Sequence, residues 1–286
     1  MPRLTILLTR GFKRLHREVA EWVQHALWDS IFLDLPVEAK PYLDAYLEDD
    51  IGEDELWRSY KLLTGLTDPF INSLKLRFQP VLESLKQSFL KSRKVHCYTD
   101  LRSEVERKGL TERLLLLEFR YRATGRLDLK EWRRLLFDEV EALKEAGERA
   151  IPRIIDESEG SPHNLALYSG FLDGVNYIGR RNFDVEIVLL KEYWKSPLDT
   201  LRTMAWKHGV ENIPDETIET YLKLHKSYTD LVLKLPEIDQ AHEVWSRRVQ
   251  TKRRLEEGRS ASSLRRSGLV GMDDWRRPSN LEEDRP

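Results

Sequence analysis

The chain has 286 residues, of which 40% are hydrophobic and 34% are charged, a balance typical of a soluble, well-packed protein. Its 47 lysines and arginines nearly match its 49 aspartates and glutamates, and the formal net charge is −2. This near-balance argues against a dedicated nucleic-acid coat protein and against a polybasic membrane module. High charge of both signs, with one cysteine and three methionines, resembles the composition of thermophile proteins.

The cysteine content and the hydropathy pattern indicate a compartment. The single cysteine, Cys97, cannot form a disulfide within the chain, which favours a reducing environment. It lies in an apolar run, where a buried and inert thiol is expected. No stretch approaches the ~20 apolar residues of a membrane span, and residues 4–8 are too short for the core of a signal peptide. We therefore expect a cytoplasmic protein with no membrane span.

The chain begins with a pattern typical of a βαβ unit. Residues 4–8 form an apolar run that predicts a buried strand, and residues 12–27 carry apolar side chains at helical spacing. A second strand is expected over residues 28–36, ending near Asp34 and a proline. A strand, a helix and a strand within about 35 residues indicate parallel strands joined by a right-handed crossover.

Helices and short strands alternate in the sequence that follows. Residues 37–94 are predicted to be mainly helical, with the clearest apolar face over residues 74–90, and residues 101–157 are predicted to be helical again. Asp128 and Glu131 indicate a capped helix start before residues 129–143. Three further strands are expected, each a short apolar run: residues 95–100, 165–168 and 185–190.

These elements predict an α/β fold, with a mostly parallel central sheet, helices on both faces and a C-terminal helical subdomain. We expect the α/β domain over residues 1–190, with a helical insert at about residues 37–94. Helix caps and apolar faces predict the helical subdomain over residues 191–250. The apolar periodicity stops there, so residues 251–286 predict a disordered tail.

Two strand-ending turns are the first candidates for a site, because ligands of open α/β sheets bind at the carboxyl edge of the strands. Arg10 and Gly11 follow the first strand, and Arg10 is suited either to clamp an anion or to pair with a nearby carboxylate. Gly170, Asp173 and Gly174 follow the strand over residues 165–168. These glycines permit close backbone approach to an anion, although tight packing of a strand on a helix requires the same residues.

The order of elements resembles the TraB/ChaN-like superfamily over residues 1–190. The resemblance rests on a strand ending FLDLP at residues 32–36, a strand ending CYTD at residues 97–100, and the sequence LALYSGFLDG at residues 165–174. That superfamily includes pheromone-shutdown proteins, Tiki-type metalloproteases, erythromycin esterases and haem-linked ChaN lipoproteins. Its two turns usually read Gly-x-x-His. Here they read TRGF and SGFLD, so the chain resembles a degenerate member that lacks both histidines.

The resemblance also marks individual residues. Asp34 stands where the superfamily keeps an acidic residue after its second strand. Glu148 and Arg149, expected at the start of a helix before the last pair of strands, resemble an Arg/Glu pair of the superfamily. We expect a protein that acts by binding, either of a small anionic ligand at the sheet edge or of a protein partner.

An enzymatic alternative uses carboxylates as metal ligands. Asp34 and Asp100 end neighbouring predicted strands, so with Glu148 they would hold Mg²⁺ or Mn²⁺ in a metal-dependent hydrolase, assisted by His16. The competing interpretation is that each aspartate caps the helix or turn that follows it. No zinc or nucleotide motif is present, and no other cofactor is predicted.

Partner binding has two candidate sources. Residues 268–275 are a hydrophobic island in the polar tail, suited to a short motif that becomes ordered on a protein partner. Its apolar side chains are Leu269, Val270, Met272 and Trp275. Basic clusters elsewhere leave nucleic-acid association as a further alternative, but acidic residues lie among them and favour ordinary solvated helix surfaces.

Overall fold

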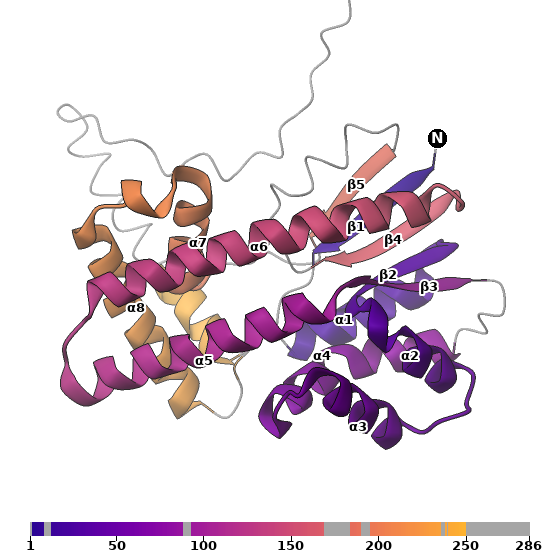
Figure 1. Cartoon of the computed structure of the whole chain (residues 1–286), viewed down its shortest axis with the longest axis horizontal. Helices are drawn as coiled ribbons and strands as arrows, with labels where there is room; N and C mark the ends of the chain where they lie inside the picture. The colour runs from indigo at the N-terminus through magenta and orange to yellow at the C-terminus, as the bar shows by residue number, and fades with distance from the viewer. Residues whose placement is uncertain are drawn as a thin grey trace, which may run out of the picture. The chain divides into compact units, whose positions relative to one another are not determined.

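The structure is a computed structural model, and it describes residues 2–8, 13–87, 93–168, 184–189, 195–235, 238 and 240–249 (Figure 1). The chain divides into two compact units, Met1–His242 and Glu243–Pro286, and the elements described below belong to the first. Within the described ranges, no helix combines the length and the apolar character needed to cross a lipid bilayer.

A parallel sheet forms the centre of the first unit. Its strands are β1 (Arg3–Leu8), β2 (Ser30–Pro36), β3 (Lys94–Thr99), β4 (His163–Tyr168) and β5 (Asp184–Leu189). They lie in the order β3-β2-β4-β1-β5, and all paired strands run parallel. The predicted α/β class is therefore confirmed.

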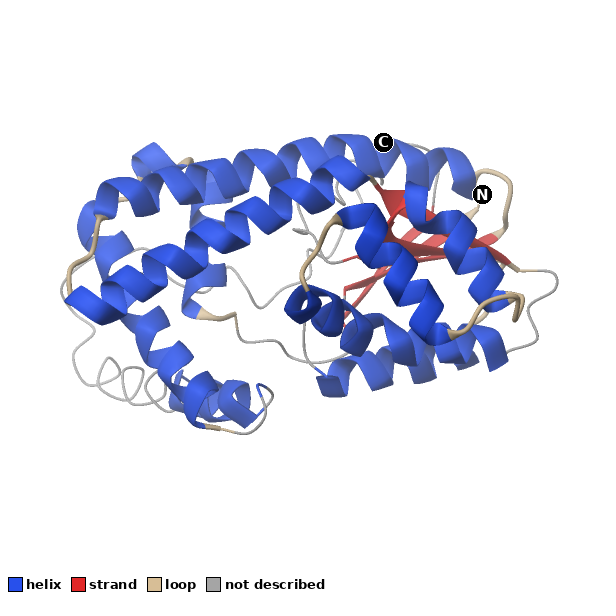
Figure 2. Cartoon of the chain, turned by 60° about the horizontal axis from the view of Figure 1, so that its bottom comes forward, coloured by secondary structure: helices blue, strands red, loops and turns tan. Residues whose placement is uncertain are grey.

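Helices surround the sheet (Figure 2). They are α1 (Lys13–His25), α2 (Lys40–Leu47), α3 (Glu53–Thr64), α4 (Asp68–Gln87), α5 (Leu101–Thr124), α6 (Leu129–Ser158), α7 (Pro197–His208) and α8 (Asp215–Lys234). Single 3₁₀ turns, η1 (Val37–Ala39) and η3 (Val210–Asn212), precede α2 and α8. The insert between β2 and β3 is helical, as the sequence predicted.

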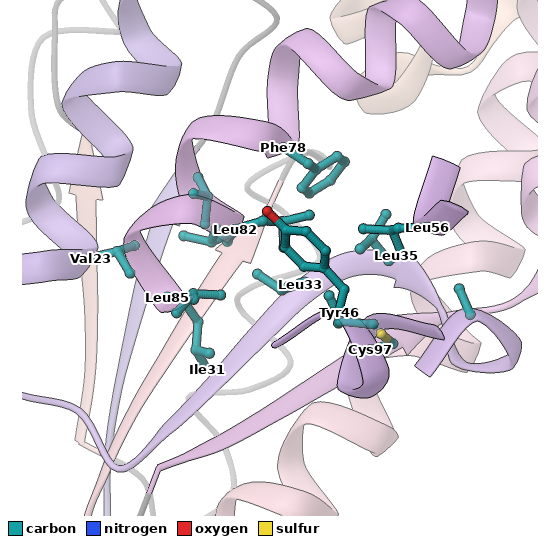
Figure 3. Packing of buried hydrophobic residues seen from close by; sticks show 14 of the residues in the cluster. Val23, Ile31, Leu33, Leu35, Tyr46, Leu56, Phe78, Leu82, Leu85 and Cys97 are labelled. Atoms are coloured by element: carbon teal, nitrogen blue, oxygen red, sulfur yellow. The ribbon is translucent and has the colours of Figure 1, made fainter. Parts of the chain in front are cut away.

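Side chains along the strands alternate between two hydrophobic cores, because neighbouring residues of a strand point to opposite faces. Leu7 and Leu33 belong to the core formed with α1, α3 and α4, part of which Figure 3 shows. Ile6 and Phe32 belong to the other core, which α6 covers with Ile154 and its neighbours. The sheet is thus buried on both faces, and polar chemistry is confined to its edges.

Cys97 contributes to the first core and is one of the residues labelled in Figure 3. The thiol is buried, and this burial raises its pKa to about 12. A thiol with this pKa is protonated at neutral pH and is a poor nucleophile. The expected buried thiol is confirmed.

Two helices extend beyond their predicted bounds. The apolar face over residues 74–90 gives the wrong start for its helix, because α4 begins at Asp68 with a proline at the next position, a favoured helix start. The prediction that Glu148 starts a helix is also wrong, because it lies inside α6. Gly147 and Pro152 weaken the local helix signal, but burial of Ile151 and Ile154 against the sheet outweighs it.

A third core lies away from the sheet, among α5, α6, α7 and α8. It is built on buried side chains such as Leu117, Leu136, Leu201 and Leu222. Ser196 caps α7 by accepting a hydrogen bond of 3.1 Å from the backbone N–H of Asp199, and Asp128 caps α6 in the same way. The predicted caps are therefore present, and the helical region packs on the α5–α6 hairpin.

Candidate functional site

The carboxyl edge of the sheet carries a group of charged and hydroxyl-bearing side chains from four elements. β2 contributes Asp34, α4 contributes Arg77, α5 contributes Glu104 and Arg107, and α3 contributes Tyr60. We call these five residues the sheet-edge cluster. It lies where the sequence placed a ligand site, and Asp34 is the member that the sequence predicted.

Asp34 is a buried carboxylate with two guanidinium neighbours. Arg77 donates from Nη2 to Oδ2 of Asp34 over 3.1 Å, and Arg107 Nη1 lies 3.7 Å from the same oxygen. A buried carboxylate requires compensation because its desolvation is costly. The two arginines supply that compensation from different helices, so they tie α4 and α5 to the end of β2.

Glu104 is also buried, and it accepts a hydrogen bond from Nη2 of Arg107. Burial and the neighbouring Asp34 charge raise the pKa of Glu104, although the Arg107 guanidinium opposes them. Burial alone would lower the pKa of Arg107, but the carboxylates of Asp34 and Glu104 outweigh it and raise that pKa. Arg107 is therefore a permanent cation, and 39% of its side chain remains exposed to solvent.

Three buried tyrosines lie at this edge of the sheet. Burial raises the pKa of Tyr60, Tyr98 and Tyr168, that of Tyr168 to about 12, so all three are neutral at pH 7. Tyr98 donates to the carbonyl oxygen of Leu167 over 2.9 Å. The Tyr60 hydroxyl, in contrast, is buried with no hydrogen-bond partner among the described residues. A buried orphan hydroxyl is unusual in a folded protein and is common where a ligand or water completes a site.

Asp100 follows β3 and has different partners from Asp34. Its Oδ1 accepts hydrogen bonds of 2.8 Å from the backbone N–H and the hydroxyl of Ser103, and Arg149 Nε donates to its Oδ2 over 2.8 Å. Burial would raise the pKa of Asp100, but these hydrogen bonds outweigh it and lower that pKa. Asp100 thus caps α5, which is the competing interpretation that the sequence offered.

The structure does not gather the carboxylates of the enzymatic alternative. Glu148 is exposed on α6, and its neighbour Arg149 binds Asp100. Within the described part of the chain, no group of three or more His, Cys, Asp or Glu side chains is placed to hold a metal ion. His16 lies in α1, and its side chain is outside the described residues.

Other predicted site residues also lie outside the described residues, both at the turns and in the tail. They are Arg10, Gly11, Gly170, Asp173 and Gly174, together with Leu269, Val270, Met272 and Trp275.

Sequence reasoning missed most of the sheet-edge cluster. Arg77, Glu104 and Arg107 are charged residues on amphipathic helices, which is the commonest place for such residues. One signal was present: Glu104 and Arg107 are three residues apart and directly follow a strand that ends at the sheet edge. Arg77 offered no such signal, because only the packing of α4 brings it to Asp34.

No family model matches the chain, and neither the curated proteins nor the solved structures contain a match to it.

Proposed function

We propose that the protein binds a small anionic ligand at the carboxyl edge of its sheet, through the guanidinium groups of Arg77 and Arg107. The observation that carries the proposal is the pair of arginines on the single buried carboxylate of Asp34. Glu104 also accepts a hydrogen bond from Arg107, but its burial raises its pKa, so it gives up its proton at a higher pH than an ordinary glutamate and compensates the guanidinium less readily.

The geometry supports an anion rather than a cation as the ligand. The two carboxylates are buried, whereas more than a third of the Arg107 side chain faces solvent. An approaching ligand therefore meets N–H donors before it meets carboxylate oxygens. A guanidinium has five N–H donors arranged to match a carboxylate or phosphate group, and the contacts of Arg107 with Glu104 and Asp34 do not use all of them.

The first test is ligand-dependent thermal stability of the full-length protein. Inorganic phosphate, sulfate, malonate and acetate are compared with sodium chloride at equal ionic strength, because bulk salt also changes stability. A ligand at one hundred times its dissociation constant stabilises the native state by about 2.7 kcal/mol. We expect at least one of these anions to raise the Tm beyond the chloride control. Equal curves for all five salts would contradict the proposal.

Variants then locate the binding site. Arg107→Met removes the exposed guanidinium, and we expect the anion affinity to fall by about 1.5–3 kcal/mol, the contribution of charged hydrogen bonds. Arg107→Lys keeps the positive charge but loses the planar, forked set of N–H donors, so we expect anion affinity between those of the wild type and Arg107→Met. Arg126→Met is the matched control, since Arg126 is exposed in the loop between α5 and α6.

A compensated variant separates binding from folding. Arg107→Met leaves Glu104 buried without its cation, which alone reduces stability. Glu104→Gln combined with Arg107→Met removes both charges of this pair and retains similar side-chain volumes. We expect this double variant to fold with near wild-type stability but to lose the anion response. An unchanged anion response in the double variant would exclude Arg107 as a ligand contact.

We also propose, from the resemblance over residues 1–190, that the chain is a degenerate member of the TraB/ChaN-like superfamily. The helical insert between β2 and β3 supports this proposal, and the sequences TRGF and SGFLD, which contain no histidine, are the reason to propose a degenerate member. A non-catalytic member is expected to release no product from model esters and peptides, with or without added Mn²⁺. Turnover that Asp34→Asn abolishes would instead favour the hydrolase alternative.

A further inference from the structure

Helix α5 carries apolar side chains on two opposite sides. Leu114 to Leu117 are four consecutive leucines, and successive residues of a helix are rotated by about 100°, so the four surround most of the helix. Leu117 is buried in the third core, and Leu114 packs against that core. Leu115 and Leu116, however, are 55% and 56% exposed. The third core therefore contacts only two of these four leucines.

Phe119 extends the exposed apolar surface. It is 69% exposed and lies four residues after Leu115 and three after Leu116, which places all three side chains on one side of the helix. We call these three residues the α5 outer face. α5 and α6 lie side by side in Figure 1. On α5, the α5 outer face lies on the side opposite Leu114 and Leu117, which contact the third core. A contiguous exposed apolar surface of this kind is typical of a protein–protein contact.

Charges beside the α5 outer face indicate which partner covers it. Glu112 and Arg120 are both exposed and lie four residues before and four residues after Leu116. Neither forms an ion pair with another described residue. If two copies of α5 pack antiparallel about Leu116, Glu112 of one copy comes level with Arg120 of the other. The two-fold symmetry repeats this pairing, so the surface is complementary to itself.

We propose that the protein forms a symmetric dimer in which the α5 outer faces of two copies pack antiparallel, centred on Leu116. Leu115, Leu116 and Phe119 of each copy form the apolar centre, and the two Glu112–Arg120 pairs lie at its rim. This arrangement follows the usual anatomy of an interface, with an aromatic anchor at the centre and charges outside it. It does not depend on the anion site, which α5 contributes to nearer its N-terminal end.

Analytical ultracentrifugation of the full-length protein over a concentration series tests the dimer. The wild type is expected to reach twice the chain mass of 33.8 kDa. The double variant Leu116→Asp with Phe119→Asp is expected to remain a monomer with an unchanged circular dichroism spectrum. Leu62→Asp is the control, because Leu62 is an exposed leucine on α3, outside the α5 outer face. A monomeric wild type, or a dimer that the double variant leaves intact, would overturn the proposal.

Charge reversal tests the antiparallel register. Glu112→Arg places two arginines at each end of the contact, and we expect the dissociation constant to rise by about tenfold or more. Adding Arg120→Glu to the same chain exchanges the two charges and is expected to restore dimerisation. Restored dimerisation in the variant with both changes supports the register. If the two substitutions acted only by removing native side chains, their losses of affinity would add. Failure of the exchange to restore any affinity would overturn the register.

Discussion

Two buried ion clusters in this molecule combine arginines and carboxylates in different ways. In the helical region, Arg202 forms two parallel hydrogen bonds to Glu139, of 2.6 and 2.9 Å, and a third of 3.2 Å to Asp199. One cation there serves two carboxylates. At the sheet edge, two cations, Arg77 and Arg107, share the carboxylate of Asp34, and Glu104 is a second carboxylate beside Arg107.

This difference distinguishes the Arg202 cluster, which has a structural role, from the sheet-edge cluster, which is the candidate binding site. The hydrogen bonds of Arg202 fix the guanidinium in a bidentate geometry that joins α6 to α7, and such a geometry leaves little for a ligand to add. Arg107 is more exposed, its contact with Asp34 is longer, and the nearby hydroxyl of Tyr60 has no partner in the described part of the chain. Arg107 therefore presents N–H donors to solvent, where an anion can accept hydrogen bonds from them.

The largest effect is expected at the centre of the sheet-edge cluster. Asp34→Asn removes the charge that both guanidinium groups share, and we expect the free energy of unfolding to fall by about 3–5 kcal/mol. Urea denaturation measures this loss. Asp100→Ala is the matched control at the end of the neighbouring strand, where loss of the side chain that caps α5 costs about 1 kcal/mol. Equal losses in the two variants would show that Asp34 is no more than a cap.

Removing the arginines one at a time compares the two clusters directly. Arg202→Met leaves Glu139 buried without its cation, so we expect a loss of about 3 kcal/mol in unfolding free energy and an unchanged response to anions. Arg107→Met leaves Glu104 buried in the same way, so we expect a loss of similar size, together with weaker anion binding. Denaturation with and without phosphate measures both quantities. An anion response that Arg202→Met weakens and Arg107→Met leaves unchanged would contradict our comparison.

The pH dependence of stability tests the burial of Glu104. Its pKa in the folded state lies above the ordinary value of 4.5, so between these values the folded protein holds a proton that the unfolded chain has released. Stability from Glu104 is therefore fully present below pH 4.5 and falls as the pH rises through the folded pKa. Each unit of difference corresponds to about 1.4 kcal/mol.

Glu104→Gln should remove this loss, so the variant gains stability relative to wild type as the pH rises above 4.5. Asp100→Asn should show the opposite pH dependence. The pKa of Asp100 is lowered below 3.8, and its contribution is lost only as the pH falls. Denaturation at a series of pH values distinguishes the two variants, and parallel profiles would contradict the assignment.

The smallest effect is expected for Tyr60→Phe. The hydroxyl that this change removes has no hydrogen-bond partner among the described residues, so its loss forfeits no bond. We expect the free energy of unfolding to stay within about 0.5 kcal/mol of wild type, or to rise. A loss greater than 1 kcal/mol would reveal a tightly held water or another partner on this hydroxyl.

The periodic parts of the fold were predictable because each depends on local sequence. The alternation of Ile6 with Leu7, and the run Phe78 to Leu85, report which side chains are buried before any partner is known. The length of α6 was not predictable in this way. Its second half contains Gly147 and Pro152, and it stays helical because the sheet buries one of its faces.

The candidate site was predictable only at its strand end. Asp34 is conspicuous because a carboxylate in a buried strand requires a partner. Its partner Arg77 is 43 residues away in sequence, on a helix with several other charged residues, and nothing local distinguishes it. Charge compensation between distant elements is a property of the packed structure, so a single sequence does not indicate which cation provides it.

The strand order has a consequence for synthesis on the ribosome. β1 is synthesised before the other described strands, but in the described sheet its partners are β4 and β5, and 160 residues separate Arg3 from its partner His163. β2, its neighbour β3 and the helices between them are complete much earlier. The nascent chain therefore carries β1 as an unpaired apolar strand until β4 has been synthesised, and such a segment is the kind that chaperones bind. β1 becomes enclosed in the sheet only after β2 and β3 are complete.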